Sequence, residues 1–236
     1  MSILHERVHL DTTDHDDSRA PFTHFKVIHP QPQPKFVTFR HGSPAPFALA
    51  RASMNVIVLP GSGCAPTREC NYYHWLERAL VDRGIVADVR VTIPSMPDPH
   101  LCRRNVWVPH VEREMRCDAS SVVVGHSSGA VCAMRVAERN ALRGIVLVAG
   151  YDDDLGDADE RASGYFGPDA FDYDKIHENC GGRVECVIGA RDSLVPAEMQ
   201  RALAVKLRAR ETLCERRDHF FTPPAEEIVD AIVRML

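Results

Sequence analysis

The chain has 236 residues, of which 44% are hydrophobic and 26% charged, values that are ordinary for a globular protein with a full core. A formal net charge of −5 and a pI near 6.2 give no electrostatic reason to expect a nucleic acid or an anionic membrane as a partner. The sequence has no apolar run near the roughly 18 residues of a membrane span, and its first residues lack the apolar core of a signal peptide.

The eight cysteines are scattered along the chain without a C-x-x-C pair. Several lie inside apolar segments that read as strands or helices. Without a secretory signal, this usage favours buried free thiols in a reducing compartment. We therefore expect a cytoplasmic protein.

Residues 1–53 differ in composition from the rest of the chain. They hold half of the twelve histidines, the acidic string DTTDHDD and the alternating string HPQPQPK at 29–35. Spaced prolines favour an extended, unpaired chain, so we predict a poorly ordered extension here. Met54 directly precedes the first convincing strand, and we hypothesise that translation can also start there, which mass spectrometry of the native protein would test.

The string HERVH at residues 5–9 matches H-E-x-x-H, in which two histidines one helical turn apart bind zinc and the glutamate acts as a base. Such a site needs a packed helix, a third ligand and a pocket that excludes water, whereas these residues lie at a polar terminus. Adventitious metal binding by this histidine-rich segment is a better interpretation than zinc proteolysis. We predict no metal site and no cofactor.

From Met54 onward, strand-like and helix-like segments alternate. Strands are predicted at 55–61, 86–94, 120–125, 142–150, 183–189 and 211–218. Helices are predicted at 72–84, 105–117, 129–140, 196–210 and 223–236. Strands that alternate with helices of this length imply right-handed βαβ units and a parallel sheet covered on both faces. The predicted fold class over 54–236 is α/β.

One turn carries a serine between two glycines. Gly125-His126-Ser127-Ser128-Gly129 follows the apolar strand SVVV at once and leads directly into a helix. G-x-S-x-G alone is a weak pattern, but between a strand and a helix it indicates a strained turn that exposes the serine hydroxyl at the carboxyl edge of a sheet. We identify Ser127 as the candidate nucleophile and interpret Ser128 as the structural serine of the pair.

A serine hydroxyl needs a base, and the base needs an orienting acid. In this architecture the partners follow in the order Asp, then His, each just after a later strand. Asp192 follows the strand VECVIG, and His219 follows the last strand. The other histidine after the serine, His177, lies in the polar stretch YDKIHENCGG and is interpreted as a solvated loop residue.

The oxyanion of an acyl-transfer reaction needs backbone donors. The N–H of Ser128, at the start of a helix, is one candidate. The glycine-rich loop LPGSGCAP after the first strand offers a second, either Ser62 or Gly63, and a simple strand-to-helix turn explains this loop equally well.

Several longer strings resemble the small serine hydrolases named after retinoblastoma-binding protein 9, a subfamily of the α/β-hydrolases. They are PGSG, MPDP, VWVPHVEREMRCD, VGHSSGAVCAMR, IVLVAGYDDDLGD, ERASGYF and the HF at 219–220. The resemblance covers much of 55–236. It implies an α/β-hydrolase fold with a mostly parallel central sheet, a triad of Ser127, Asp192 and His219, and small esters, amides or short peptides as substrates.

The resemblance also implies a shallow pocket, for which Trp107, Tyr165 and Phe166 are the candidate wall residues. Two departures matter. The residue before the histidine is Asp218 where the family has glycine, and its carboxylate could raise the imidazole pKa or compete for the ring. The L-x-C-x-E string attributed to retinoblastoma binding is replaced by MRCDA at 115–119, so we do not predict that partner.

The main alternative is a non-catalytic α/β module that acts through protein contacts, because such folds host many functions. Three triad candidates in the expected order argue against it. No phosphate-binding G-x-x-x-x-G-K and no dinucleotide-binding G-x-G-x-x-G is present. We predict a cofactor-independent serine hydrolase.

Overall fold

The computed structural model describes residues 54–84 and 89–236. The extension predicted over 1–53 and the HERVH string lie outside these residues. The boundary predicted at residue 54 therefore stays a prediction.

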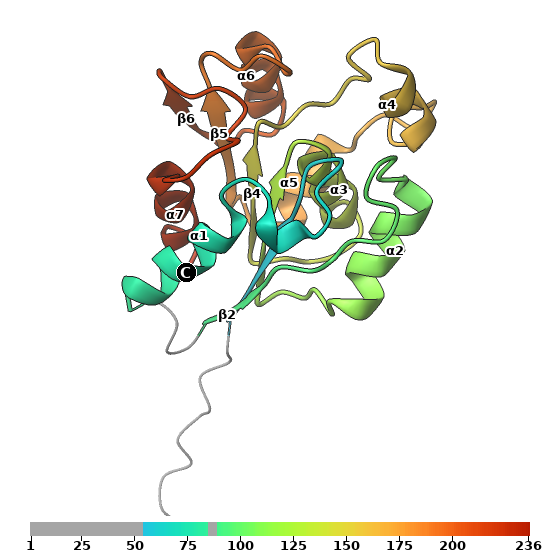
Figure 1. The fold of residues 1–236 in the computed structure, drawn as a ribbon. Coiled ribbons are helices and arrows are strands. Elements are labelled where there is room, and N and C mark those ends of the chain that lie inside the picture. The colour runs from blue at the N-terminus through green and yellow to red at the C-terminus, as the bar shows by residue number, and fades with distance from the viewer. Residues whose placement is uncertain (1–53, 85–88) are drawn as a thin grey trace, which may run out of the picture. The chain divides into compact units, whose positions relative to one another are not determined.

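The described residues form one sheet of six parallel strands in the order β2-β1-β3-β4-β5-β6. The strands are β1 (Met54–Leu59), β2 (Val89–Thr92), β3 (Ser121–His126), β4 (Gly144–Val148), β5 (Val184–Gly189) and β6 (Arg210–Cys214). The parallel sheet with crossing helices confirms the predicted α/β class (Figure 1).

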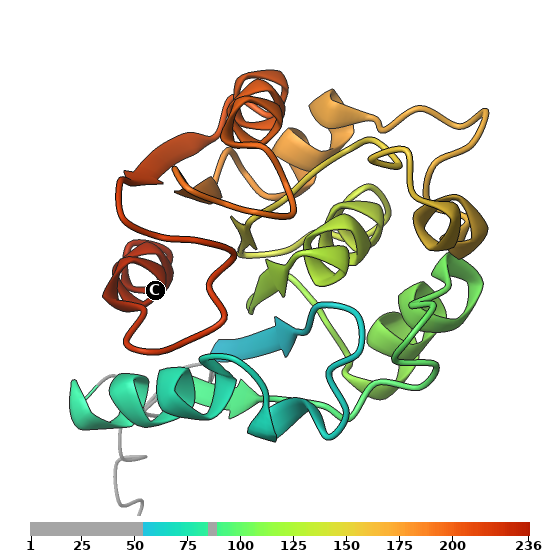
Figure 2. The ribbon, with the colours of Figure 1, turned by 45° about the horizontal axis from the view of Figure 1, so that its top comes forward.

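Helices cover both faces of the sheet (Figures 1 and 2). One face carries α1 (Tyr73–Asp82) and α7 (Glu226–Val233). The other face carries α2 (Arg104–Glu114), α3 (Ser128–Ala137), α5 (Tyr173–Asn179) and α6 (Ala197–Lys206). Two short elements, the 3-10 helix η1 (Thr67–Glu69) and α4 (Ala158–Ser163), lie in the loops after β1 and β4.

The central strands are buried on both faces because their side chains are apolar at successive positions. In β1, Ile57 and Leu59 pack into the core below α2 and α3, and Val56 and Val58 pack into the core below α1 and α7. Side chains of a strand alternate between its two faces, so a continuous apolar run is what a doubly covered strand needs.

The segment between β4 and β5 differs from the prediction, because it contains α4 and α5 although no helix was predicted there. Each helix starts at an aspartate cap: Asp157 accepts hydrogen bonds from Asp159 and Glu160, and Asp172 accepts one from Lys175. Helices this short show too few turns for an apolar period to be visible in the sequence.

His177 therefore lies in α5 and not in a solvated loop. The ring is only partly exposed, and its Nδ1 lies 3.0 Å from the Leu207 carbonyl oxygen. The loop interpretation of His177 was wrong because the helix that carries it was not visible in the sequence.

Candidate active site

The turn at Ser127 joins β3 directly to α3. β3 ends at His126, α3 begins at Ser128, and Ser127 between them has φ 54° and ψ −122°. A non-glycine residue in this region of backbone space is strained and persists only when its surroundings hold it. The Ser127 N–H donates to the Val148 carbonyl at 3.0 Å, which fixes the turn to β4.

The two glycines of this turn are required by close backbone approaches. A Cβ on Gly125 would lie 2.4 Å from the Gly129 carbonyl oxygen, and a Cβ on Gly129 would lie 2.4 Å from the Leu59 carbonyl oxygen. Only glycine allows β1, β3 and α3 to pack this closely. The local sequence therefore explains how the serine is held at the strand end.

The structure brings His219 and Asp192 together. His219 follows β6, Asp192 follows β5, and the imidazole Nδ1 lies 2.9 Å from both carboxylate oxygens. Both side chains are almost fully buried. Because a carboxylate only accepts, Nδ1 carries the proton of the neutral ring and Nε2 is left as the basic nitrogen.

Asp192 is itself held by further donors. The backbone N–H groups of Leu194 and Val195 donate to Oδ1 at 2.9 and 2.8 Å, and Gln200 Nε2 donates to Oδ2 at 2.9 Å. Burial alone would raise the pKa of Asp192, but the hydrogen bonds from His219, Val195 and Leu194 outweigh it and lower the pKa below its usual value. The carboxyl group therefore stays ionised. Sequence reasoning missed Gln200, which nothing in the pattern of α6 distinguishes.

Asp218 does not bond to the imidazole ring. Its Oδ1 accepts from the backbone N–H and hydroxyl of Ser193 and from the His219 backbone N–H, all at 2.8 Å. Hydrogen bonds from Ser193 lower the pKa of this carboxyl. Asp218 thus ties the loop that carries the acid to the loop that carries the histidine.

No hydrogen bond joins the Ser127 hydroxyl to His219 among the described residues. His126, the residue before the serine, has its ring centroid 5.0 Å from that of His219. The imidazole ring of His219 thus packs beside the residue that precedes Ser127, and the cavity lining includes Ser127 but not His219.

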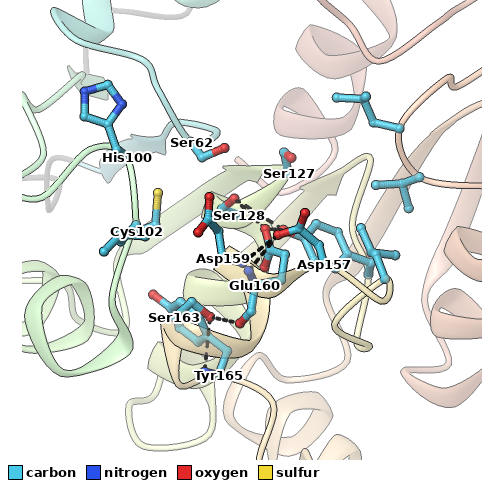
Figure 3. A pocket seen from close by; sticks show the side chains of 15 residues that line it. Ser62, His100, Cys102, Ser127, Ser128, Asp157, Asp159, Glu160, Ser163 and Tyr165 are labelled. Carbon is cyan, nitrogen blue, oxygen red and sulfur yellow. Dashed lines mark hydrogen bonds between the residues drawn. The ribbon is translucent and has the colours of Figure 1, made fainter.

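Ser127 opens into a cavity of about 410 Å³. Figure 3 shows Ser62, Ser127 and Cys102 around this space, with Asp157, Asp159 and Glu160 gathered beside Ser128. The lining residues are Ser62, His100, Leu101, Cys102, Ser127, Ser128, Tyr151, Leu155, Asp157, Asp159, Glu160, Ser163, Tyr165, Leu194 and Val195.

The three predicted wall residues are placed differently from one another. Tyr165 lines the cavity. Phe166 does not line it, and its ring is stacked 5.9 Å from that of Tyr151. Trp107 is fully buried in the core, where its Nε1 donates to the Pro97 carbonyl at 2.6 Å, and the cavity lining does not include it.

The two candidate donors of the first loop are also placed differently. The Gly63 N–H donates to the Pro99 carbonyl at 2.7 Å and is therefore occupied. Ser62 lines the cavity together with Ser128, and within the described part of the chain neither backbone N–H has an acceptor. Ser128 is the first residue of α3, where orphan N–H groups and the helix dipole favour negative charge.

Glu160 is a half-buried carboxylate of the cavity that sequence reasoning did not single out. The Tyr151 hydroxyl donates to its Oε1 at 2.6 Å, and the Ser128 hydroxyl lies 3.4 Å from the same atom. Burial raises the pKa of Glu160 despite these two donors, and repulsion from Asp157 adds to the increase. Glu160, Asp157 and Asp159 give this part of the cavity a negative charge.

Two further observations concern metals and membranes. Across residues 54–84 and 89–236, no group of three or more His, Cys, Asp or Glu side chains is arranged to hold a metal ion. None of the helices described here has the length and apolar character needed to cross a membrane.

The family model and the relative that match this chain are both described as serine hydrolases. The model of the family described as serine hydrolase matches residues 57–222. The serine hydrolase RBBP9 of Rattus norvegicus is 33% identical over 181 residues, which cover 76% of this chain and 94% of the relative.

Solved structures share the fold. The ydeN gene product of B. subtilis superposes with a TM-score of 0.66 at 24% identity, covering 77% of this chain and 98% of its own. The esterase RhEst1 of Rhodococcus sp. ECU1013 superposes with a TM-score of 0.52 at 14% identity, covering 78% and 90%. These matches show that the parallel sheet and its helices form an α/β-hydrolase fold.

Proposed function

The chain belongs to the serine hydrolase family, and from this premise we propose that Ser127, His219 and Asp192 form its catalytic triad. The substrates are small esters or amides, aminoacyl compounds and short peptides among them. The observation that carries the proposal is the buried Asp192–His219 pair, whose imidazole ring lies 5.0 Å from that of His126, the residue next to the strained Ser127.

In this mechanism the Ser127 hydroxyl attacks the acyl carbon while His219 Nε2 takes its proton. Asp192 keeps the ring in the tautomer with the proton on Nδ1 and stabilises the imidazolium that forms. His219 then protonates the leaving group. In the second step His219 Nε2 takes a proton from the water that attacks the acyl-enzyme, and it returns this proton to the Ser127 oxygen as the acid is released. The hydrogen bond between serine and histidine is often loose in an empty site and tightens when substrate binds.

The backbone N–H groups of Ser62 and Ser128 are the proposed oxyanion donors. Both residues line the cavity at Ser127, and both N–H groups lack an acceptor among the described residues. Donors already in place stabilise the charge that develops on the substrate oxygen without reorganisation. Gly63 is not proposed, because its N–H is occupied by Pro99.

The charge of the cavity supports substrates that carry a positive group. Asp157, Asp159 and Glu160 line it, and no lysine or arginine does. A protonated amine on the acyl part of an aminoacyl ester or a peptide would complement this charge. Neutral esters would be bound by the apolar atoms of Leu155, Leu194 and Tyr165.

The compartment we propose is the cytoplasm. All eight cysteines are free thiols, and six of them are buried. Burial raises the pKa of several of these thiols, for instance that of Cys186 to about 12, so they remain protonated. Unbonded thiols in this number are usual where the surroundings are reducing.

The proposal is tested by rapid mixing of the full chain with p-nitrophenyl acetate and with a p-nitrophenyl aminoacyl ester. An acyl-enzyme mechanism predicts a burst of one p-nitrophenol per active site, followed by slower turnover. The burst should be absent in Ser127→Ala. Turnover of the aminoacyl ester should exceed that of its N-acetylated form, which lacks the charge.

A folded wild-type protein that shows neither burst nor turnover would contradict the triad and favour a non-catalytic module. Equal rates with charged and uncharged esters would contradict only the substrate preference.

A further inference from the structure

Tyr73 lies in α1 on the opposite face of the sheet from α3, yet its hydroxyl is next to the active-site turn. Tyr73 is completely buried. The Gly61 N–H lies 2.9 Å from the hydroxyl oxygen, and His126 Nδ1 lies 2.7 Å from it. Asn71 Nδ2 is a further donor to this oxygen at 3.1 Å.

His126 continues the chain of hydrogen bonds. Its Nε2 lies 2.9 Å from the backbone carbonyl oxygen of His219, and only 1% of the residue is exposed. A carbonyl oxygen accepts only, so Nε2 carries the proton. Burial, and then repulsion from His219, lower the pKa of His126 to about 3, so the ring is neutral and Nδ1 is an acceptor.

These constraints set the directions of the three shortest hydrogen bonds. The Gly61 N–H donates to the Tyr73 hydroxyl, the hydroxyl donates to His126 Nδ1, and His126 Nε2–H donates to the His219 carbonyl. Asn71 Nδ2 also lies 3.5 Å from His126 Nδ1, and Cys64 Sγ lies 4.0 Å from the Tyr73 hydroxyl, but both contacts are longer than the 2.7 Å between the hydroxyl and the ring.

This series of hydrogen bonds links three parts of the site that are far apart in sequence. Gly61 precedes the proposed oxyanion donor Ser62, His126 precedes the proposed nucleophile Ser127, and His219 is the proposed base. A Cβ on Gly61 would lie 3.3 Å from the Ser127 Cβ, so this loop packs directly against the serine.

We propose that Tyr73 and His126 are positioning residues that hold the oxyanion loop, the nucleophile turn and the catalytic histidine at fixed separations through one buried chain of hydrogen bonds. This inference rests on the proposed function of Ser127 and His219. Neither Tyr73 nor His126 is among the residues that line the cavity. They keep the proposed oxyanion donors and the base at the separations that the reaction requires. A displacement of about 1 Å in such a site lowers the rate about a hundredfold.

The neighbouring tyrosine provides a matched control. Tyr72 is as fully buried as Tyr73 and packs edge-on against it at 4.9 Å, but its hydroxyl has no hydrogen-bond partner in the described part of the chain. Tyr72→Phe and Tyr73→Phe therefore remove the same atom from adjacent buried sites. Only Tyr73→Phe interrupts the series of hydrogen bonds.

The experiment compares kcat and KM of these two variants for the best ester substrate, together with their free energies of unfolding. We expect Tyr73→Phe to lower kcat about 10- to 100-fold with KM within about twofold of the wild type. Tyr72→Phe should keep wild-type kcat. If the Tyr73→Phe protein is folded and its kcat equals that of Tyr72→Phe, the positioning role is wrong.

A second readout does not depend on activity. ¹⁵N-resolved NMR of the histidine side chains, recorded between about pH 5 and 8, should show His126 as the neutral Nε2–H tautomer throughout. A ring that titrates near pH 6.5 or carries its proton on Nδ1 would overturn the hydrogen-bond chain. An inactive wild type with the expected His126 spectrum would instead contradict the proposed function.

Discussion

Two histidines lie side by side at the site, and their surroundings give them different properties. The rings of His126 and His219 are 5.0 Å apart. His219 Nδ1 lies 2.9 Å from the ionised carboxylate of Asp192, which orients the ring and sets its tautomer. His126 faces a hydroxyl and a carbonyl in a fully buried position, so it stays neutral and adds no positive charge beside the proposed base.

The two carboxylates near His219 can be separated by substitution. Asp192→Asn should lower kcat by about 10⁴, because an amide no longer holds the ring in the tautomer that leaves Nε2 basic. Asp218→Asn should lower it less than about tenfold, since Asp218 bonds to Ser193 and to the His219 backbone rather than to the ring. Steady-state kinetics of both folded variants measure the difference.

The contrary result would be a larger loss for Asp218→Asn than for Asp192→Asn. That outcome would make Asp218 the partner of the imidazole, as its position next to His219 in the sequence allows.

At the scale of the elements, the turn between β3 and α3 depends on backbone packing as much as on its serine. Gly125 faces the start of α3, and Gly129 faces the end of β1. The helix can therefore start directly at the strand end, with its orphan N–H groups beside the cavity.

Substitution of one of these glycines should destabilise the whole chain. Gly129→Ala would place a Cβ 2.4 Å from the Leu59 carbonyl oxygen, and we expect it to lower the free energy of unfolding by about 3 kcal/mol. Gly167→Ala is the matched control: an added Cβ there meets nothing within 4 Å, so the change should stay within about 0.5 kcal/mol. Denaturant unfolding measures both, and equal stabilities would contradict the packing account.

The sequence was sufficient to predict features that depend on neighbouring residues along the chain, such as an apolar run or a polar residue just after a strand. Apolar runs predicted the buried strands, and residues just after strand ends supplied the candidates Ser127, Asp192 and His219. These features are local, so a single sequence carries them.

Features that depend on contacts between distant segments were not visible in the sequence. The bonds of Tyr73 to Gly61 and His126 require that β1 and β3 be neighbours and that α1 pack behind them. Trp107 was expected at the pocket because the family resemblance implied it, whereas in the structure α2 turns it into the core. The choice between Ser62 and Gly63 required knowing where Pro99 lies.

At the scale of the whole molecule, strand order assembles the site. β3 lies between β1 and β4, and β5 and β6 follow on the same side, so the loops after β1, β3, β5 and β6 all begin at the carboxyl edge of one parallel sheet. In open α/β sheets this edge is where ligands bind.

Burial of a neutral histidine links the stability of the whole fold to pH. The pKa of His126 is about 3 in the folded chain against an ordinary value of 6.5. Between these values the unfolded chain binds a proton that the folded chain does not, so acid favours unfolding. The contribution of His126 to the free energy of unfolding is fully present above about pH 6.5. It is lost as the pH falls towards 3, at up to about 1.4 kcal/mol per pH unit.

Denaturant unfolding at about pH 7 and pH 5 measures this effect in the wild type and in His126→Gln. The wild type should lose at least 1 kcal/mol more than the variant between these two pH values. Asp192, whose pKa is lowered in the folded chain, changes the free energy of unfolding only at pH values below this range. Other titratable groups contribute equally to the pH dependence of both proteins. Identical losses in the two proteins would show that His126 is not held neutral.

Labelling with a fluorophosphonate probe followed by peptide mass spectrometry measures whether Ser127 is an activated nucleophile. We expect one adduct per chain on Ser127, no adduct in Ser127→Ala and much slower labelling in His219→Ala. A folded wild-type protein that stays unlabelled, or an adduct on a different residue, would contradict this role of Ser127.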